Sequence, residues 1–268
     1  MSSRPVAPDD RFQLGAPYER YMGRWSRLVA PRFLDWLAAP AGRDWVDVGC
    51  GTGVLTEAVL DRCAPASVLG VDPSAGFLET ARARLGERAR LAEGDAAALP
   101  LPAAAVDVVV AGLVLNFVPD PGAALAEWRR VVRPAGLVAA YLWDYGDGMC
   151  LIREFFDAAV QLDPAVAELD EGARFRWAKP EPLGRLFGEA FGVDARVGAI
   201  EVVARFADFD DYWQPFLGGQ GPAPAYVVGL EADHRDALRD LLRRRLPTAH
   251  DGSITLPLRA WAVAVDAP

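Results

Sequence analysis

The chain has 268 residues, of which 52% are hydrophobic and 24% charged, as expected of a globular protein with a sizeable core. Its formal charge of -9 argues against a nucleic-acid partner, and no apolar run reaches the about 20 residues that membrane insertion needs. Three isolated cysteines argue against a disulfide framework and a zinc site, and they favour a reducing, cytoplasmic location.

The predicted elements of the first half alternate between helix and strand. A helical segment over residues 17–38 comes first. Buried-strand patterns then follow at residues 45–48, 67–71, 89–92, 106–111 and 137–143. The helices between them are predicted at residues 54–60, 75–85 and 121–132, with Ser74 and Asp120 as N-caps and Gly86 as a stop. Such alternation predicts a parallel sheet covered by helices on both faces.

The second half does not continue this regular alternation of strand and helix. Helices are predicted at residues 149–160, 182–191 and 225–246, and strands at residues 195–206 and 254–265. Residues 218–224, with three glycines and two prolines, are expected to form a gating loop over a pocket.

Four regions result from these patterns. They are an N-terminal helical cap (1–40), a ligand-binding core (41–144), lid helices (145–192), and closing strands of the sheet with an inserted helix and the gating loop (193–268).

The strongest motif is the sequence VDVGCGTG at residues 46–53, between the first strand and the next helix. Its alternate glycines allow a tight turn and a close backbone approach to a ligand, and the helix start presents free N–H groups to an anion. A dinucleotide-binding loop is the nearest alternative. That pattern needs its last glycine where this chain has Val54, and Asp47 stands directly before the first glycine.

Further segments over about residues 40–145 all fit the motifs of a single protein family. They are VDPS at 71–74, EGDAAALP at 93–100, DVVVA at 107–111 with LNF at 115–117, and RRVVRPAG at 129–136. With the glycine-rich loop, the chain resembles the class I S-adenosylmethionine-dependent methyltransferases, in particular those related to ubiquinone and menaquinone biosynthesis. The resemblance implies an α/β, doubly wound, mostly parallel seven-stranded sheet with a helical lid. It also implies S-adenosyl-L-methionine as cofactor and S-adenosyl-L-homocysteine as product.

The same resemblance assigns cofactor contacts residue by residue. It implies that Asp47 supports the loop and the ammonium of the cofactor, that Asp72 accepts from both ribose hydroxyls, and that Asp95 accepts from the adenine amino group. The further expected contacts are Gly49, Cys50 and Gly51 along the methionine part, Pro73 and Phe77 beside the adenine, Ala96 through its N–H, Ala111 through its carbonyl, and Tyr21, Arg24, Trp25 and Ser26 from the N-terminal segment. For each one the alternative is that it only turns or caps the backbone.

Few side chains in the sequence could act as a general base. Relatives often carry His where this chain has Asn116, and asparagine cannot act as a base. Asp144, directly after the fifth strand, is the best candidate for orienting or deprotonating a substrate, with a turn residue as the alternative. His234 and His250 are expected at the surface.

The lid is rich in aromatic residues, which favours an apolar pocket. Its predicted lining is Trp143, Tyr145, Phe155, Phe175, Trp177 and Phe216. The predicted function is therefore methyl transfer to O, N or C of a small, largely apolar or aromatic metabolite, in a monomer or homodimer. An RNA or protein methyltransferase and a non-catalytic cofactor-binding protein are the alternatives.

Overall fold

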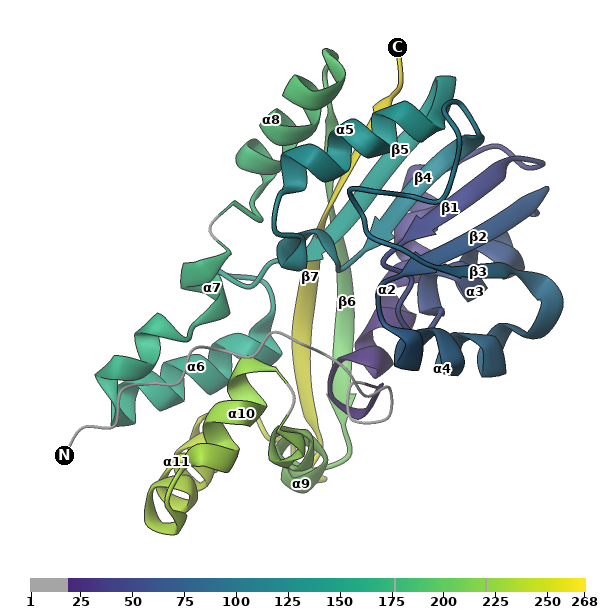
Figure 1. The fold of residues 1–268 in the computed structure, drawn as a ribbon. Helices are drawn as coiled ribbons and strands as arrows, with labels where there is room; N and C mark the ends of the chain where they lie inside the picture. The colour runs from purple at the N-terminus through teal and green to yellow at the C-terminus, as the bar shows by residue number, and fades with distance from the viewer. Residues whose placement is uncertain (1–18, 176, 220) are drawn as a thin grey trace.

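The computed structural model of the chain describes residues 19–175, 177–219 and 221–268 (Figure 1). They form a seven-stranded sheet in the order β3-β2-β1-β4-β5-β7-β6, with helices on both faces. Across these described ranges, none of the helices combines the length and apolar character needed to span a membrane.

The predicted parallel sheet is present, and two antiparallel strands extend it. Strands β1 to β5 pair in parallel, whereas β7 runs antiparallel to both β5 and β6. The strands are β1 (Asp44–Val48), β2 (Ser67–Asp72), β3 (Arg90–Glu93), β4 (Val106–Gly112), β5 (Val132–Trp143), β6 (Arg196–Phe206) and β7 (Ile254–Asp266). The chain crosses from β3 past β1 to β4, so the carboxyl ends of β1 and β4 form the switch point at which such sheets bind ligands.

Helices cover the two faces of the sheet unequally. One core contains α2, α3 and the helices α6, α9, α10 and α11, which are together called the cap from here on, and the other contains α5 and α8. The α-helices are α2 (Arg24–Leu37), α3 (Val54–Arg62), α4 (Ala75–Leu85), α5 (Pro121–Val131), α6 (Cys150–Leu162), α7 (Glu171–Arg174), α8 (Pro180–Phe191), α9 (Phe209–Trp213), α10 (Pro222–Gly229) and α11 (Ala232–Arg245). The short π or 3-10 turns are η1 (Glu19–Gly23), η2 (Gly86–Arg88), η3 (Leu115–Phe117), η4 (Pro164–Glu168) and η5 (Gln214–Gly218).

Both predicted N-caps are confirmed by their hydrogen bonds. The Ser74 hydroxyl accepts from the N–H of Phe77 at 3.3 Å, and the Asp120 carboxylate accepts from the N–H of Ala123 at 2.9 Å. Gly86 follows α4 with φ +58°, as a helix stop requires.

The cap differs from the sequence prediction in two places. The single helix predicted over residues 225–246 is two helices, because Leu230 and Glu231 adopt extended backbone angles after Gly229. Residues 222–224, expected in the gating loop, instead form the buried first turn of α10, where Pro222 suits a helix start. Residue 220 of that loop and residues 1–18 of the N-terminal cap lie outside the described residues.

Candidate functional site

The glycine-rich loop joins β1 to α3 at the carboxyl edge of the sheet. The N–H groups of Gly49 and Cys50 both donate to the carbonyl of Val71 at the end of β2, at 2.7 and 3.0 Å. Gly49 has φ +69°, and a Cβ there would lie 2.5 Å from both γ-carbons of Val114. The loop therefore needs glycine at this position for its backbone angle and for the close approach of the segment after β4.

Asp47 places a buried carboxylate directly beneath this loop. Its side chain is 1% exposed, and its Oδ2 accepts a hydrogen bond from the Thr56 hydroxyl of α3 at 2.6 Å. Burial raises the pKa of Asp47 to about 7, against the lowering effect of that hydrogen bond. Its Oδ1 is buried without a hydrogen-bond partner among the residues that the structure describes. A buried carboxylate oxygen in this state is a ready acceptor for a positively charged ligand group.

Asp72 ends β2 beside the loop and binds its backbone. One carboxylate oxygen accepts from the N–H of Gly51 at 2.9 Å and the other from the N–H of Ser74 at 2.8 Å. Burial raises the pKa of Asp72, and these two hydrogen bonds work against the increase. Each oxygen keeps further lone-pair capacity for a ligand hydroxyl.

These groups line one cleft at the switch point of the sheet. Helix α2 contributes Ser26 to it, and β5 contributes Tyr141. The remaining lining residues are Asp47, Gly49, Cys50, Gly51, Thr52, Val54, Leu55, Asp72, Phe77, Gly112, Leu113, Val114 and Phe117. The cleft thus combines the predicted motif residues with an apolar wall after β4. Burial also raises the pKa of the Cys50 thiol, which keeps it protonated.

Tyr141 and Leu113 are cleft residues that the sequence reasoning missed. The Tyr141 side chain packs so closely on Gly112 that a Cβ there would lie 2.6 Å from its hydroxyl oxygen. Leu113 has φ +63°, and its N–H donates to the carbonyl of Tyr141 at 2.8 Å. Backbone strain of this kind in a non-glycine residue is common at functional sites. A signal for Tyr141 was available, because it lies on the same strand face as Trp143.

The residues expected to contact the adenine do not all line the cleft. Phe77 lines the cleft, whereas Pro73 and Asp95 are exposed. The Asp95 carboxylate accepts from the N–H of Ala97 at 2.8 Å, and the carbonyl of Ala96 accepts from the Trp128 indole at 3.1 Å. Ala111 is buried in β4, directly before cleft residue Gly112.

Of the four expected N-terminal contacts, Ser26 alone is a lining residue of this cleft. The Arg24 guanidinium binds the Asp211 carboxylate at 2.7 and 3.1 Å and lies over the Trp25 ring at 4.2 Å. Tyr21 packs edge-on against Phe216 with ring centroids 5.5 Å apart. These contacts give Tyr21, Arg24 and Trp25 a packing role between α2 and the cap.

The two candidate catalytic residues have different surroundings. Asn116 lies in η3, next to cleft residue Phe117, and its Oδ1 is buried without a partner among the described residues. One Asp144 oxygen accepts from Arg259 at 2.8 and 2.5 Å, and the other accepts from the N–H of Asp147 at 3.1 Å. Asp144 is 1% exposed, and its ion pair with Arg259 and its bond to the turn favour the turn residue of the alternative interpretation.

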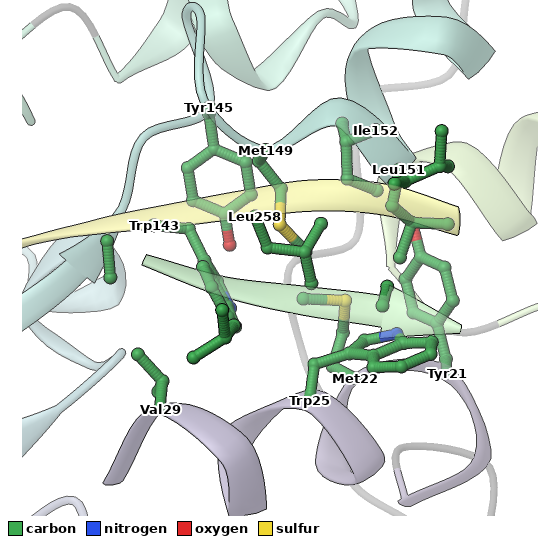
Figure 2. Close-up of a cluster of buried hydrophobic side chains, with 14 of the residues drawn as sticks. Tyr21, Met22, Trp25, Val29, Trp143, Tyr145, Met149, Leu151, Ile152 and Leu258 are labelled. Atoms are coloured by element: carbon green, nitrogen blue, oxygen red, sulfur yellow. The ribbon is translucent and has the colours of Figure 1, made fainter. Parts of the chain in front are cut away.

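The aromatic residues predicted to line a substrate pocket pack mainly on one another. Trp143, Tyr145, Phe155 and Phe216 belong to one buried cluster, part of which Figure 2 shows between α2, β6, β7 and α6. The rings of Phe155 and Phe216 stack at 4.6 Å. Phe175 and Trp177 are partly buried, and Phe175 contacts Phe117 with centroids 5.7 Å apart. Phe175 therefore touches the wall of the cleft.

Comparison with known proteins identifies this combination of fold and loop. The family described as "Methyltransferase domain" matches residues 46–140. A malonyl-[acyl-carrier protein] O-methyltransferase of Serratia marcescens is 34% identical over 137 residues, 51% of each chain. A trans-aconitate 2-methyltransferase of Methylobacterium radiotolerans is 34% identical over 134 residues, 46% of this chain and 51% of the relative. The chain thus spans about half the length of these curated relatives.

Solved structures show the same fold at lower identity. A putative methyltransferase from an antibiotic biosynthesis pathway of Anabaena variabilis superposes with a TM-score of 0.59 and 20% identity, over 88% of this chain and 96% of that one. The predicted fold class and the resemblance to class I methyltransferases are confirmed, while the finer likeness to quinone-biosynthesis enzymes stays a prediction.

Proposed function

We propose that this chain, whose residues 46–140 match the methyltransferase domain family, is a class I S-adenosylmethionine-dependent methyltransferase that transfers a methyl group from S-adenosylmethionine to a small acceptor. The observation that carries the proposal is the unpartnered, buried Oδ1 of Asp47 beneath a glycine loop whose other end is held by Asp72. One cleft therefore offers an acceptor for an ammonium and acceptors for a ribose diol.

The residues of the cleft fit that cofactor. Asp47 would accept from the methionine ammonium together with the carbonyl of Ala111, and Asp72 would accept from the ribose hydroxyls. The absence of side chains at Gly49 and Gly51 lets the backbone follow the ligand closely. We further propose that the adenine lies between Phe77 and Pro73, within reach of Asp95 and the N–H of Ala96. When bound, S-adenosylmethionine supplies a methyl group activated by its positively charged sulfur.

The acceptor would enter on the apolar side of the cleft. Leu113, Val114 and Phe117 form this wall, and they exclude water from the reacting atoms. Asn116, with its buried and unpartnered Oδ1, would orient a hydrogen-bond donor of the acceptor. These residues would catalyse the in-line transfer mainly by holding the acceptor near the methyl group, with no general base from Asp144.

We favour a small apolar or aromatic acceptor. Two relatives are named for malonyl-carrier and trans-aconitate substrates, both acids. None of the cleft-lining residues in the described ranges is an Arg or Lys that would pair with such an acid. The formal charge of -9 disfavours an RNA acceptor for the same electrostatic reason.

Calorimetry and a transfer assay test this function together. S-adenosylmethionine and S-adenosylhomocysteine are expected to bind and NAD not to bind, because the loop has Val54 where a dinucleotide loop needs glycine. Methyl-labelled cofactor should then label a small aromatic acceptor from a panel. Binding of NAD alone would contradict the cofactor assignment, and label that enters only RNA or protein would contradict the acceptor class.

Cofactor affinity is expected to fall with decreasing pH through Asp47. Its pKa of about 7 means that the carboxyl becomes protonated below that pH, and an ammonium must then displace a proton to bind. Affinity should drop by about tenfold per pH unit below 7, down to about pH 5.5. Titrations should stay below about pH 7.5, because an α-amino group itself loses its proton near 8.

The matched variant is Asp47→Asn, which keeps the size of the side chain and removes its titration. It should bind more weakly at pH 7.5, with a flat pH dependence from 5.5 to 7.5. An unchanged slope in this variant would assign the dependence to another group.

A further inference from the structure

Strand β6 is an edge strand whose side chains alternate between exposed and buried from Ala199 to Phe206. It ends the sheet order and pairs only with β7 among the described strands. Ile200, Val202, Ala204 and Phe206 are buried against the cap and α2. The residues between them are exposed, namely Ala199, Glu201, Val203 and Arg205. This exposed row therefore forms a free sheet face at a free edge, a feature that natural proteins usually protect.

Val203 and the charges beside it stand out in this row. Val203 is 48% exposed, an unusual exposure for a β-branched residue in a strand. Glu201 and Arg205 have no ion-pair partner within the described part of the chain. They cannot pair with each other, since four residues of strand separate them by about 13 Å. The row thus carries one acid and one base at equal spacing on either side of an exposed valine.

The backbone of the same residues points outward from the sheet. The carbonyl of Arg205 accepts from the Arg24 side chain at 3.0 Å, so it is directed away from β7. Because the direction of backbone groups alternates along a strand, the N–H and C=O groups of Val203 and Glu201 are expected to point the same way. The N–H of Ala207 donates to Asp211, which limits the free edge at that end.

An antiparallel copy of this strand is its own complement. With Val203 opposite Val203 of a second copy, Glu201 falls opposite Arg205 twice, once on each side of a two-fold axis. All paired residues are then ones whose backbone groups point outward, as an antiparallel ladder requires, although the Arg205 carbonyl keeps Arg24 as its donor and the ladder forms through the other outward groups. The opposite charges lie on one face of the joined sheet, at the spacing at which cross-strand pairs stabilise it.

Helix α2 lies beneath the same edge and adds apolar surface. It runs antiparallel to β6, since Arg24 at its start contacts the carbonyl of Arg205 and Arg196 contacts the carbonyls of Trp36 and Leu37 at its end. The middle of α2 therefore lies below the middle of β6. Leu28, in that middle part, is 41% exposed. Leu28 lies one helical turn after Arg24, which reaches the edge of β6, so a two-fold axis through Val203 is expected to bring Leu28 of both copies toward the same contact and to increase the apolar area buried.

We propose that a second copy of this chain binds at β6, joining the two sheets by antiparallel pairing of Glu201 to Arg205 about Val203. This isologous contact makes a homodimer with one continuous sheet. In this dimer the cleft at the carboxyl ends of β1 and β4 lies away from the contact between the two copies. The inference is independent of the proposed methyl transfer, because oligomeric state is measured without cofactor or acceptor.

Sedimentation velocity of the full chain over about 1 to 100 µM tests the proposal. A dimer is expected for the unchanged protein. Glu201→Arg and Arg205→Glu should each weaken it by about tenfold or more, because each places like charges opposite one another twice. The double variant E201R/R205E restores both opposite-charge pairs and should dimerise like the unchanged protein. Val228→Glu is the matched control, since Val228 is 55% exposed and lies in α10, away from β6.

The double variant makes the experiment specific to the register. A protein that is monomeric over the whole range contradicts the proposal. So does a dimer that neither single variant weakens, or one that the double variant fails to restore. Circular dichroism melting of each variant checks that the chain is folded, so that loss of the dimer is not confused with loss of the fold.

Discussion

Replacing Gly49 with Ala is expected to destabilise the fold by about 2–5 kcal/mol and to abolish cofactor binding. Two costs add at this position. Its φ of +69° lies in the left-handed region, which costs a residue with a Cβ about 1–2 kcal/mol. A Cβ would also lie 2.5 Å from two carbons of Val114, so either the loop or the segment after β4 must shift. Urea unfolding and cofactor titration measure the two effects.

Gly51 provides the matched control for this prediction. Its φ is +54°, yet a Cβ there would meet nothing within 4 Å. Gly51→Ala should therefore show only the conformational cost, about 1–2 kcal/mol. The double variant G49A/V114A should recover part of the stability lost in Gly49→Ala, because it removes the two contacts at 2.5 Å, leaves the one to Cβ at 3.0 Å and keeps the strained angle. Equal destabilisation by Gly49→Ala and Gly51→Ala would show that the contact with Val114 is unimportant.

The parallel half of the sheet and the cofactor loop could be predicted because their signals are local. A strand covered on both faces is a short apolar run, as at β4, and a ligand loop needs glycines at fixed spacing. The same is true of the caps at Ser74 and Asp120, where one side chain bonds a nearby N–H. Each of these features depends on residues that are close in sequence.

Contacts between distant segments explain what was missed. Arg24 was expected at the cofactor, but its partner Asp211 lies 187 residues away. Likewise Asp144 was a candidate base because nothing near it in sequence indicates Arg259. The aromatic residues of the predicted lid were expected to line a pocket, and Phe155 and Phe216 instead pack against each other in the core. Composition alone does not distinguish an apolar pocket from a packed core, because the same residues build both.

Substitution of Asp72 by Ala is expected to weaken cofactor binding by about 2–4 kcal/mol, roughly 30- to 1,000-fold, with a smaller effect on stability. Hydrogen bonds from a ribose diol to a carboxylate contribute about 1.5–3 kcal/mol each, so losing both would cost about 3–6 kcal/mol, and the desolvation cost that disappears with the carboxylate lowers this to the expected range. Burial raises the pKa of Asp72, which means that the folded protein holds the ionised side chain at a cost. Two hydroxyl donors from a ligand would offset that cost. Replacing Asp72 with Ala therefore removes both the cost of burying the charge and the hydrogen bonds to the ligand.

Ser74→Ala separates this direct effect from a general loss of order. The Ser74 hydroxyl caps α4 through the N–H of Phe77, while its backbone N–H still donates to Asp72. This variant should lose about 1 kcal/mol of stability and keep an affinity close to that of the unchanged protein. Calorimetric titration of all three proteins at pH 7.5 measures the difference. If Ser74→Ala loses as much affinity as Asp72→Ala, the carboxylate acts by ordering the turn after β2 and does not itself hold the ribose.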